Sequence, residues 1–335
     1  MVAEPQLTSH LKRTPASLKE LAGKFKCSQN AIKEVIKELR LRGIMVEKAG
    51  DKFFIPKAPR DTGKKFIYES NKHNEYVFGF IGDTHLCSQY ERLDVLNDLY
   101  DLFEQAGVDR VFHQGNYIEG EAHFNRFELK VHGMTNQVNY LVEHYPKKEF
   151  VTFAVTGDDH EGWYAKSSGV DIGRYVEQSM IAAGRLDWVN TGFLESFIEL
   201  KNKNSGKGTQ LLSIHPGGGS AYALSYRPQK LVESFQGGEK PSVLLIGHYH
   251  KLSYNLIRNV HAIQTGCTQD QSVFMRKGPI EPHVGGGICR LSQDPRTGSI
   301  ISCTVQIFPY YNKGFYNDRW GYSGLINLPE RSRNG

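Results

Sequence analysis

Two histidines, one residue apart, follow a short apolar segment in the second half of the chain. Residues 242–246 are Ser-Val-Leu-Leu-Ile, and the chain continues with Gly247, His248, Tyr249 and His250. The apolar run predicts a buried strand, and ligands of α/β proteins bind beyond the carboxyl ends of such strands. Glycine permits a sharp turn at that point. Two imidazoles on the turn can bind a transition-metal ion, although an isolated His-x-His pair is more often a surface feature.

The same order, an apolar segment followed by Asp, Asn or His, occurs four more times. Residues 76–82, 108–114, 150–156 and 210–214 each have the composition of a short buried strand. The polar residues that follow them are Asp83 and His85, Asn116, Asp159 and His160, and His215. Any one of these residues is easily explained as a capping or core side chain. Five occurrences in one chain indicate a functional site built at strand ends.

Length and composition limit the class of protein. The 335 residues are enough for two domains. No stretch approaches the ~20 apolar residues of a membrane span, and residues 1–5 lack a secretion pattern. The five cysteines are scattered and form no Cys-x-x-Cys pair, which argues against a disulfide framework or a structural zinc site. We therefore expect a cytoplasmic protein without membrane contact.

Positive charge is concentrated at the start of the chain. Residues 1–60 hold 13 Lys and Arg against 6 Asp and Glu, whereas the whole chain has a formal net charge of only +5. Such asymmetry is typical of a domain that contacts a polyanion. A solvated lysine-rich surface would give the same count.

The basic segment has the pattern of a small helical unit that ends in a hairpin. Helices are predicted over 16–25 and 29–42, and hairpin strands over 44–48 and 52–56. This order resembles a winged helix-turn-helix domain, in which the second helix of the pair enters the major groove and the hairpin contacts the DNA backbone. The resemblance places six residues at a nucleic-acid surface: Gln29, Asn30, Lys33, Lys37, Lys48 and Lys52. Winged helices also bind proteins, so a protein partner is the alternative.

The remaining chain alternates predicted strands and helices. We predict the winged helix-turn-helix domain over 1–58, a polar linker over 59–75, a larger domain over 76–311 and a C-terminal tail over 312–335. Helices of the larger domain are predicted over 91–105, 126–144, 171–183 and 222–235. Its late strands are predicted over 252–258, 260–264, 284–291 and 300–308, and a surface hairpin loop over 201–208.

The polar motifs at the strand ends resemble, as an ordered set, those of the nuclease-type calcineurin-like metallophosphoesterases. The resemblance covers roughly residues 76–308 and rests on Asp83-Thr84-His85, Gly115-Asn116, Gly157-Asp158-Asp159-His160-Glu161, His215 and Gly247-His248-Tyr249-His250. It implies a mixed α/β fold with four layers, an αββα sandwich in which two mixed sheets pack face to face. It also implies a hydrolase with two divalent metal ions at the strand ends.

The resemblance assigns seven metal ligands and one catalytic residue. The ligands are Asp83, His85 and His250 for one ion, His215, His248 and Asp159 for the other, and Asn116 at the bridging position. His160 matches the family's substrate-facing histidine, which contacts phosphate and can protonate the leaving oxygen. These ligands suit Mn²⁺ first, with Fe, Zn²⁺ or Mg²⁺ as alternatives. Two ions about 3.5–4 Å apart can activate water and stabilise an in-line displacement at phosphorus.

Two positions depart from the family pattern. The bridging Asp of the family is Asn116 here, and its metal-binding Asn is Asp159, so the exchange conserves charge. A neutral amide bridges two dications poorly because it lacks a second anionic oxygen. Three interpretations stay open: Asp159 takes over as the bridge, the second ion binds weakly, or Asn116 is a change that disables the enzyme.

Several nearby residues are weaker candidates. Glu119 and Glu121 follow Asn116 closely and are expected to pair with site histidines. Glu161 is a candidate for orienting His160. Trp163 has the chemistry to stack on a base, with core packing as the equal alternative.

The predicted function is a metal-dependent phosphodiesterase that acts on nucleic acid, a DNA nuclease recruited by its basic domain. DNA is the expected partner, and the resemblance also suggests a homodimer. One alternative is a phosphatase or phosphodiesterase that acts on a small molecule or a phosphoprotein. The other is a DNA-binding scaffold with a catalytically impaired core.

Overall fold

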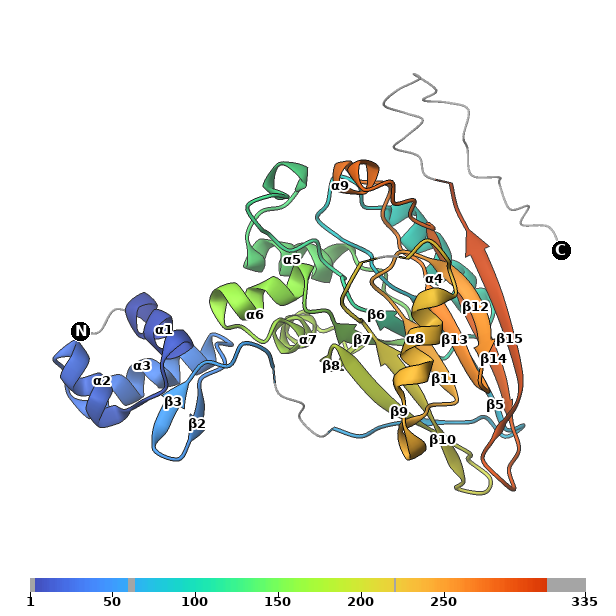
Figure 1. Cartoon of the computed structure of the whole chain (residues 1–335), viewed down its shortest axis with the longest axis horizontal. Helices are drawn as coiled ribbons and strands as arrows, with labels where there is room; N and C mark the ends of the chain where they lie inside the picture. The colour runs from blue at the N-terminus through green and yellow to red at the C-terminus, as the bar shows by residue number, and fades with distance from the viewer. Residues whose placement is uncertain (1–3, 60–63, 220, 312–335) are drawn as a thin grey trace, which may run out of the picture.

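A computed structural model describes residues 4–59, 64–219 and 221–311 of the chain. The tail predicted over 312–335 lies outside the described residues. Figure 1 shows a small N-terminal unit beside a larger body that contains two sheets. Within the described ranges, no helix is both long and apolar enough to cross a membrane.

The first sheet has the strand order β15-β14-β5-β6-β7-β8. Its strands are β5 (Glu75–Ile81), β6 (Arg110–Gln114), β7 (Val151–Thr156), β8 (Trp188–Phe193), β14 (Gly285–Gln293) and β15 (Ile300–Pro309). Strands β5 to β8 run parallel, whereas β14 is antiparallel to both of its neighbours. The carboxyl ends of β5, β6 and β7 therefore lie at one edge of the sheet.

The second sheet has the order β12-β13-β11-β10-β9-β4. Its strands are β4 (Phe66–Glu69), β9 (Glu195–Lys201), β10 (Gly208–Ile214), β11 (Val243–Ile246), β12 (Leu252–Ile257) and β13 (Val260–Thr265). Strands β10, β11 and β13 are parallel to one another, and the pairs β9–β10 and β12–β13 are antiparallel. This sheet is mixed, like the first.

The two sheets pack face to face through their apolar side chains. Phe112 on β6 belongs to a buried cluster that also contains Leu211 and Val243 of the second sheet. Its neighbour Val111 points to the opposite face and packs with the helices α4 (Leu93–Gln105), α5 (Met134–His144) and α7 (Ile172–Ala182). Helix α8 (Tyr226–Ser234) covers the outer face of the second sheet. This αββα arrangement confirms the predicted fold class.

The N-terminal unit has a core of its own. It consists of α1 (Glu4–Arg13), β1 (Ala16–Ser17), α2 (Leu18–Phe25), α3 (Gln29–Leu41), β2 (Glu47–Ala49) and β3 (Lys52–Phe54). Leu21, Ile36 and Leu39 are buried at its centre. The two predicted helices and the hairpin are present. Helix α1 was not predicted, because it buries only Leu7 and Leu11.

Two segments differ from the sequence-based predictions. Residues 59–75, predicted as a linker, contain strand β4, which pairs with β9 at the edge of the second sheet. The helix predicted over 126–144 is instead a short turn followed by α5, with Gly133 at φ 83° before the helix. The short helices of the described chain are η1 (Arg126–Glu128), η2 (His160–Gly162), α6 (Trp163–Ser168), η3 (Gly237–Glu239) and α9 (Val273–Lys277).

Strand β4 is expected to stabilise the larger domain through Tyr68. This side chain is fully buried, its hydroxyl donates to Asp109 at 2.5 Å, and the guanidinium of Arg110 lies over its ring. We predict that Tyr68→Ala lowers the free energy of unfolding by about 3–5 kcal/mol, as other buried aromatic deletions do. Urea denaturation measures this, with Ile67→Ala as the control because Ile67 is on the same strand and 46% exposed. Equal, small effects of both changes would show that the segment is a linker after all.

Candidate metal centre

The predicted site residues lie on the loops that follow β5, β6, β7, β10 and β11. Two hydrogen bonds tie the loops of the two sheets together. The backbone N–H of His248 donates to the carboxylate of Asp83 at 2.9 and 3.1 Å. His215 Nδ1 donates to the carbonyl of Gln114 at 2.5 Å. The second bond also leaves His215 Nε2 as the nitrogen available to a ligand.

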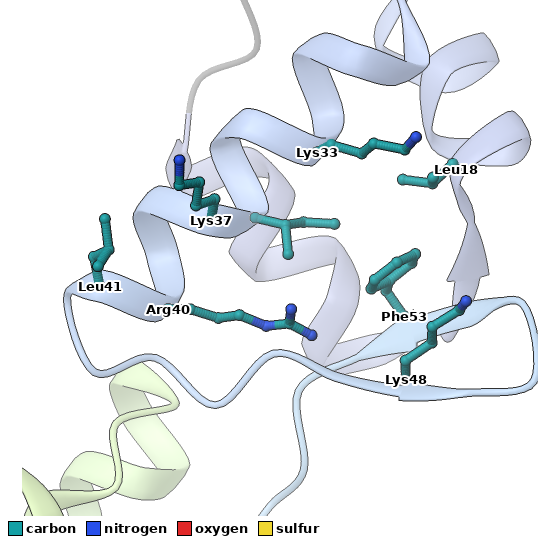
Figure 2. A pocket seen from close by; sticks show the side chains of 8 residues that line it. Leu18, Lys33, Lys37, Arg40, Leu41, Lys48 and Phe53 are labelled. Atoms are coloured by element: carbon teal, nitrogen blue, oxygen red, sulfur yellow. The ribbon is translucent and has the colours of Figure 1, made fainter.

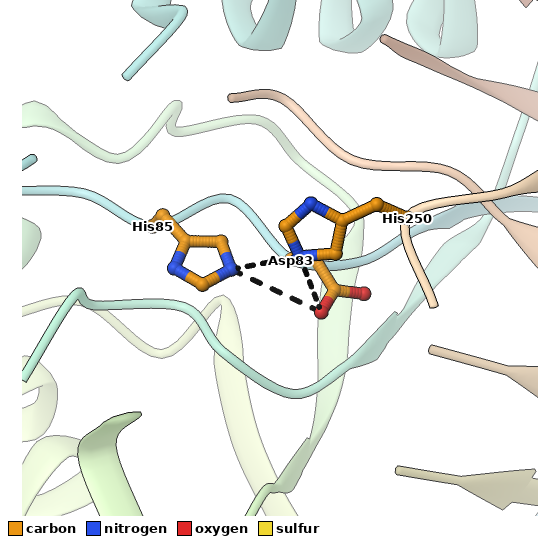
Figure 3. Close-up of side chains that lie close together, drawn as sticks. All are labelled: Asp83, His85 and His250. Atoms are coloured by element: carbon orange, nitrogen blue, oxygen red, sulfur yellow. Dashed lines mark hydrogen bonds and ion pairs between the residues drawn. The ribbon is translucent and has the colours of Figure 1, made fainter. Parts of the chain in front are cut away.

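The first cluster consists of Asp83, His85 and His250, all of them buried (Figure 3). The Nε2 atoms of His85 and His250 are 3.1 Å apart. Asp83 Oδ1 lies 3.4 Å from His250 Nε2 and 4.0 Å from His85 Nε2. Two donors bound about 2.1 Å from one ion at a tetrahedral angle are about 3.4 Å apart, so this spacing fits a divalent ion.

Two of the three residues in the first cluster have the protonation states that suit a metal ion. Burial alone would raise the pKa of Asp83, but His250 and its neighbours lower it to about 2. Burial, together with the nearby His160, lowers the pKa of His85 to about 4. At neutral pH Asp83 is therefore ionised and His85 neutral, the forms that bind metal. Burial would lower the pKa of His250, but Cys267 and Asp83 raise it well above its ordinary value, so a metal ion would have to displace the proton of this third ligand.

The second cluster consists of Asp159, His215 and His248. Asp159 Oδ1 lies 3.2 Å from His215 Nε2, and its Oδ2 lies 3.3 Å from His248 Nδ1. Burial would raise the pKa of Asp159, but the hydrogen bonds with the two histidines keep it well below its ordinary value. This set again combines one carboxylate with two imidazoles.

Asn116 lies between the two clusters. One terminal atom of its amide is 3.4 Å from Asp83 Oδ1 and 3.3 Å from His215 Nε2. The other is 2.9 Å from Asp159 Oδ1 and 3.2 Å from Glu161 Oε2. Since two carboxylates accept on that second side, the amide nitrogen belongs there. The amide oxygen then faces both clusters.

Glu161 supports Asn116, and the expectation that it orients His160 is wrong. Its Oε1 accepts the backbone N–H of Asn116 at 2.9 Å and that of Gly157 at 2.8 Å. The side chain is fully buried. It therefore positions the loops after β6 and β7 rather than His160.

Glu119 pairs with a site histidine, as expected. Its Oε2 lies 2.8 Å from His85 Nδ1, so the Nε2 of that ring faces the cluster. Such carboxylate–histidine pairs fix the tautomer and the orientation of a metal ligand. Glu121 does not join the site. It accepts the backbone N–H of Gly133 at 2.7 Å and lies 3.5 Å from His132.

His160 lies beside the first cluster. Its Nδ1 donates to the carbonyl of Glu119 at 2.9 Å, which leaves Nε2 free to exchange a proton. Its ring is 4.3 Å from the ring of His85 and stacks on Trp163 at 4.7 Å. The side chain is 22% exposed, whereas that of His85 is 1% exposed. His160 is therefore the site histidine best placed to meet an incoming molecule.

A backbone feature of the site was not predicted. Six of its residues have left-handed backbone angles, with φ between 46° and 75°: Asp83, His85, Asn116, His160, His248 and His250. This conformation is uncommon outside glycine, and it concentrates at functional sites where the surrounding structure enforces it. Residue type and spacing carry no signal for it.

The predicted nucleic-acid residues are all exposed on the N-terminal unit. A cavity of about 400 Å³ lies between α3 and the hairpin, and its lining includes Lys33, Lys37 and Lys48 (Figure 2). We call this cavity the basic groove. Arg40 also lines it and was missed, although its spacing from Lys33 and Lys37 places it on the same helical face. Gln29, Asn30 and Lys52 lie outside the lining of the groove.

The N-terminal unit contacts the segment that follows His160. The backbone N–H of Met45 donates to the carbonyl of Gly169 at 2.7 Å, and Lys12 Nζ donates to the carbonyl of Ser167. Ile44 also forms a β-bridge with Val170. These contacts reach the end of α6, which begins at Trp163. The N-terminal unit is thereby attached at the C-terminal end of the helix that follows His160.

No protein-family model and no curated protein matches the sequence. Among solved structures, an archaeal phosphodiesterase is similar at 12% identity and a TM-score of 0.36, over 69% of this chain and 99% of that one. A putative 5′-nucleotidase from Staphylococcus aureus is similar at 11% identity and a TM-score of 0.41, over 70% of this chain and 54% of the other. Vps29 of Entamoeba histolytica, solved with zinc, is similar at 12% identity and a TM-score of 0.34, over 70% and 99%. None of these similarities is high enough to assign a family.

Glu119 provides a test of the metal centre that leaves the residues of both clusters in place. We predict that Glu119→Gln weakens Mn²⁺ binding at the first cluster by about 10- to 100-fold, because His85 loses the carboxylate that orients it. Titration with Mn²⁺, followed by the electron paramagnetic resonance of the free ion, measures this. Glu121→Gln is the control, since Glu121 contacts His132 instead of a cluster residue. Unchanged Mn²⁺ affinity in both variants would contradict the role of Glu119.

Proposed function

We propose that this chain is a metal-dependent phosphodiesterase that acts on nucleic acid. The proposal rests on the paired clusters, with Asn116 between them and His160 beside them. Two ions bound there would act as Lewis acids on a phosphoryl oxygen and on the attacking water. Asp83, His85 and His250 would hold one ion, and Asp159, His215 and His248 the other.

In this proposal His160 is the catalytic acid. Its Nδ1–H is committed to the carbonyl of Glu119, so Nε2 is the atom that would deliver a proton to the leaving oxygen. Stacking on Trp163 on one side and edge contact with His85 on the other limit rotation of the ring. A fixed donor of this kind needs no reorganisation when the phosphate binds.

The N-terminal unit supports nucleic acid as the substrate class. Its order of helices and hairpin resembles that of a winged helix-turn-helix domain, and the basic groove lies between α3 and the hairpin. Lysine and arginine side chains in such a groove would neutralise phosphates of a DNA backbone. Attachment beside α6 would keep a bound strand close to His160.

The chemistry is tested by removing His160. We predict that His160→Ala lowers kcat by about 10²- to 10⁴-fold, the usual contribution of a general acid, while the Mn²⁺ content stays the same. The assay uses bis(4-nitrophenyl) phosphate and end-labelled single- and double-stranded DNA with Mn²⁺, with and without a chelator.

His132→Ala is the control for that assay, because His132 is an exposed histidine outside both clusters. Loss of metal together with activity would make His160 a ligand instead of an acid. Chelator-resistant hydrolysis would contradict a metal-dependent enzyme. Hydrolysis of the nitrophenyl diester without DNA cleavage would favour the small-molecule alternative, and no hydrolysis at all would favour the scaffold.

The basic groove is tested separately from the chemistry. We predict that the double change Lys33→Ala with Lys37→Ala weakens DNA binding and reduces the salt slope of the affinity by about one per lost phosphate contact. Hydrolysis of bis(4-nitrophenyl) phosphate should not change. The control is Lys203→Ala with Lys207→Ala, which removes the same charge from the exposed 201–208 loop. Equal DNA affinity of both double variants would end the proposal that the N-terminal unit recruits DNA.

A further inference from the structure

Four aromatic rings form a continuous series from the first metal cluster to the surface. The ring of His85 contacts that of His160 at 4.3 Å, His160 stacks on Trp163 at 4.7 Å, and Trp163 contacts Phe124 at 5.4 Å. Exposure increases along the series, from the buried His85 to Phe124, which is 69% exposed. We call Trp163 and Phe124 the aromatic step. It begins next to His160 and ends in solvent.

The loop that carries Phe124 is anchored at the metal centre. The side chain of Asn125 is buried, accepts the N–H of Ala122 at 2.8 Å and donates to Glu119 Oε1 at 3.3 Å. Glu119 in turn pairs with His85. Because Phe124 stays exposed, its ring contributes little hydrophobic stabilisation to the folded state. Its backbone is nevertheless held, through Asn125, by Glu119, the same carboxylate that orients the candidate ligand His85. Its position relative to His160 is therefore well defined.

We propose that the aromatic step binds the base of the nucleotide adjacent to the scissile phosphate, so that the preferred substrate is a single strand or an unpaired end. This inference rests on the proposed function. A phosphate at the clusters and His160 places the attached nucleoside at the rings that continue outward from His160. A base–aromatic contact is worth about 1–3 kcal/mol and accepts any base, since every base has a π face.

The surroundings of the step favour a nucleotide over an apolar protein surface. Arg126, two residues after Phe124, is exposed and suits a neighbouring phosphate. The aromatic step also lies next to His160 and the candidate metal ligands, where a phosphoryl group would bind. In a duplex both faces of a base are covered by its stacked neighbours, so only an unstacked base can use the ring of Phe124.

The experiment compares Phe124→Ala with the unchanged protein on single-stranded DNA and on a strand of equal length in which the bases are removed. In Mn²⁺, we expect Phe124→Ala to raise KM for the normal strand by about 5- to 150-fold, which corresponds to the stacking energy. Its kcat should change little, and KM for the abasic strand should be the same in both proteins. Phe124→Trp, which keeps a ring, should restore the low KM.

Phe127→Ala is the matched control, because Phe127 lies on the same loop and is 86% exposed. If Phe124→Ala leaves KM for the normal strand unchanged while cleavage continues, the aromatic step is overturned and the nuclease proposal stands. The step is also overturned if Phe127→Ala has the same effect as Phe124→Ala. If the unchanged protein cleaves neither strand but hydrolyses bis(4-nitrophenyl) phosphate, nucleic acid is the wrong substrate class and both proposals fail together.

Discussion

The close approach of the loops of the two sheets is the constraint on which the metal centre depends. A Cβ atom on Gly247 would lie 2.3 Å from the carbonyl oxygen of Gln114, and one on Gly115 would lie 2.5 Å from His215 Nδ1. Any other residue at these positions would force the loops apart. The same approach allows the backbone N–H of His248 to reach Asp83 across the sheets. Without this close approach, the ligands from the first sheet and those from the second would lie too far apart to form the two clusters.

Two buried carboxylates then organise what the close approach brings together. Glu119 orients His85 through its side chain and His160 through its carbonyl, so one residue positions both a candidate ligand and the candidate acid. Glu161 binds the backbone of Asn116 and Gly157 beneath the second side of the site. Burying such groups costs free energy unless they are fully hydrogen-bonded. Both are hydrogen-bonded: Glu119 contacts His85 and Asn125, and Glu161 accepts from the backbone of Asn116, one of the residues with left-handed angles.

The sequence predicted the parts of this molecule that repeat a simple pattern. Apolar runs followed by Asp, Asn or His identified the five strand ends, because burial of a parallel strand and a polar loop after it both leave a mark on residue type. Strand β4 was missed because only Tyr68 of its four residues is fully buried. The role of Glu161 was misassigned, and Arg40 was left out of the basic groove. The role of Glu161 depends on which side chains meet in space, and spacing along the chain does not encode this. Arg40, in contrast, has the helical spacing from Lys33 and Lys37 that would have identified it.

The geometry of the site bears on the exchange of Asn116 and Asp159. One oxygen of Asp159 pairs with His215 and the other with His248, so both of its oxygens face the histidines of the second cluster. Glu161 lies close to the amide of Asn116, but burial raises its pKa to about 8, so it adds little negative charge at neutral pH. The position between the clusters is therefore occupied by a neutral amide oxygen, while Asp83 and Asp159 each supply one carboxylate to their own cluster. Each cluster therefore contains one negative charge of its own, and that charge is not concentrated at the position of Asn116. Each cluster then has the donors to bind an ion on its own, and two ions bound there would depend less on each other than they would across a shared carboxylate.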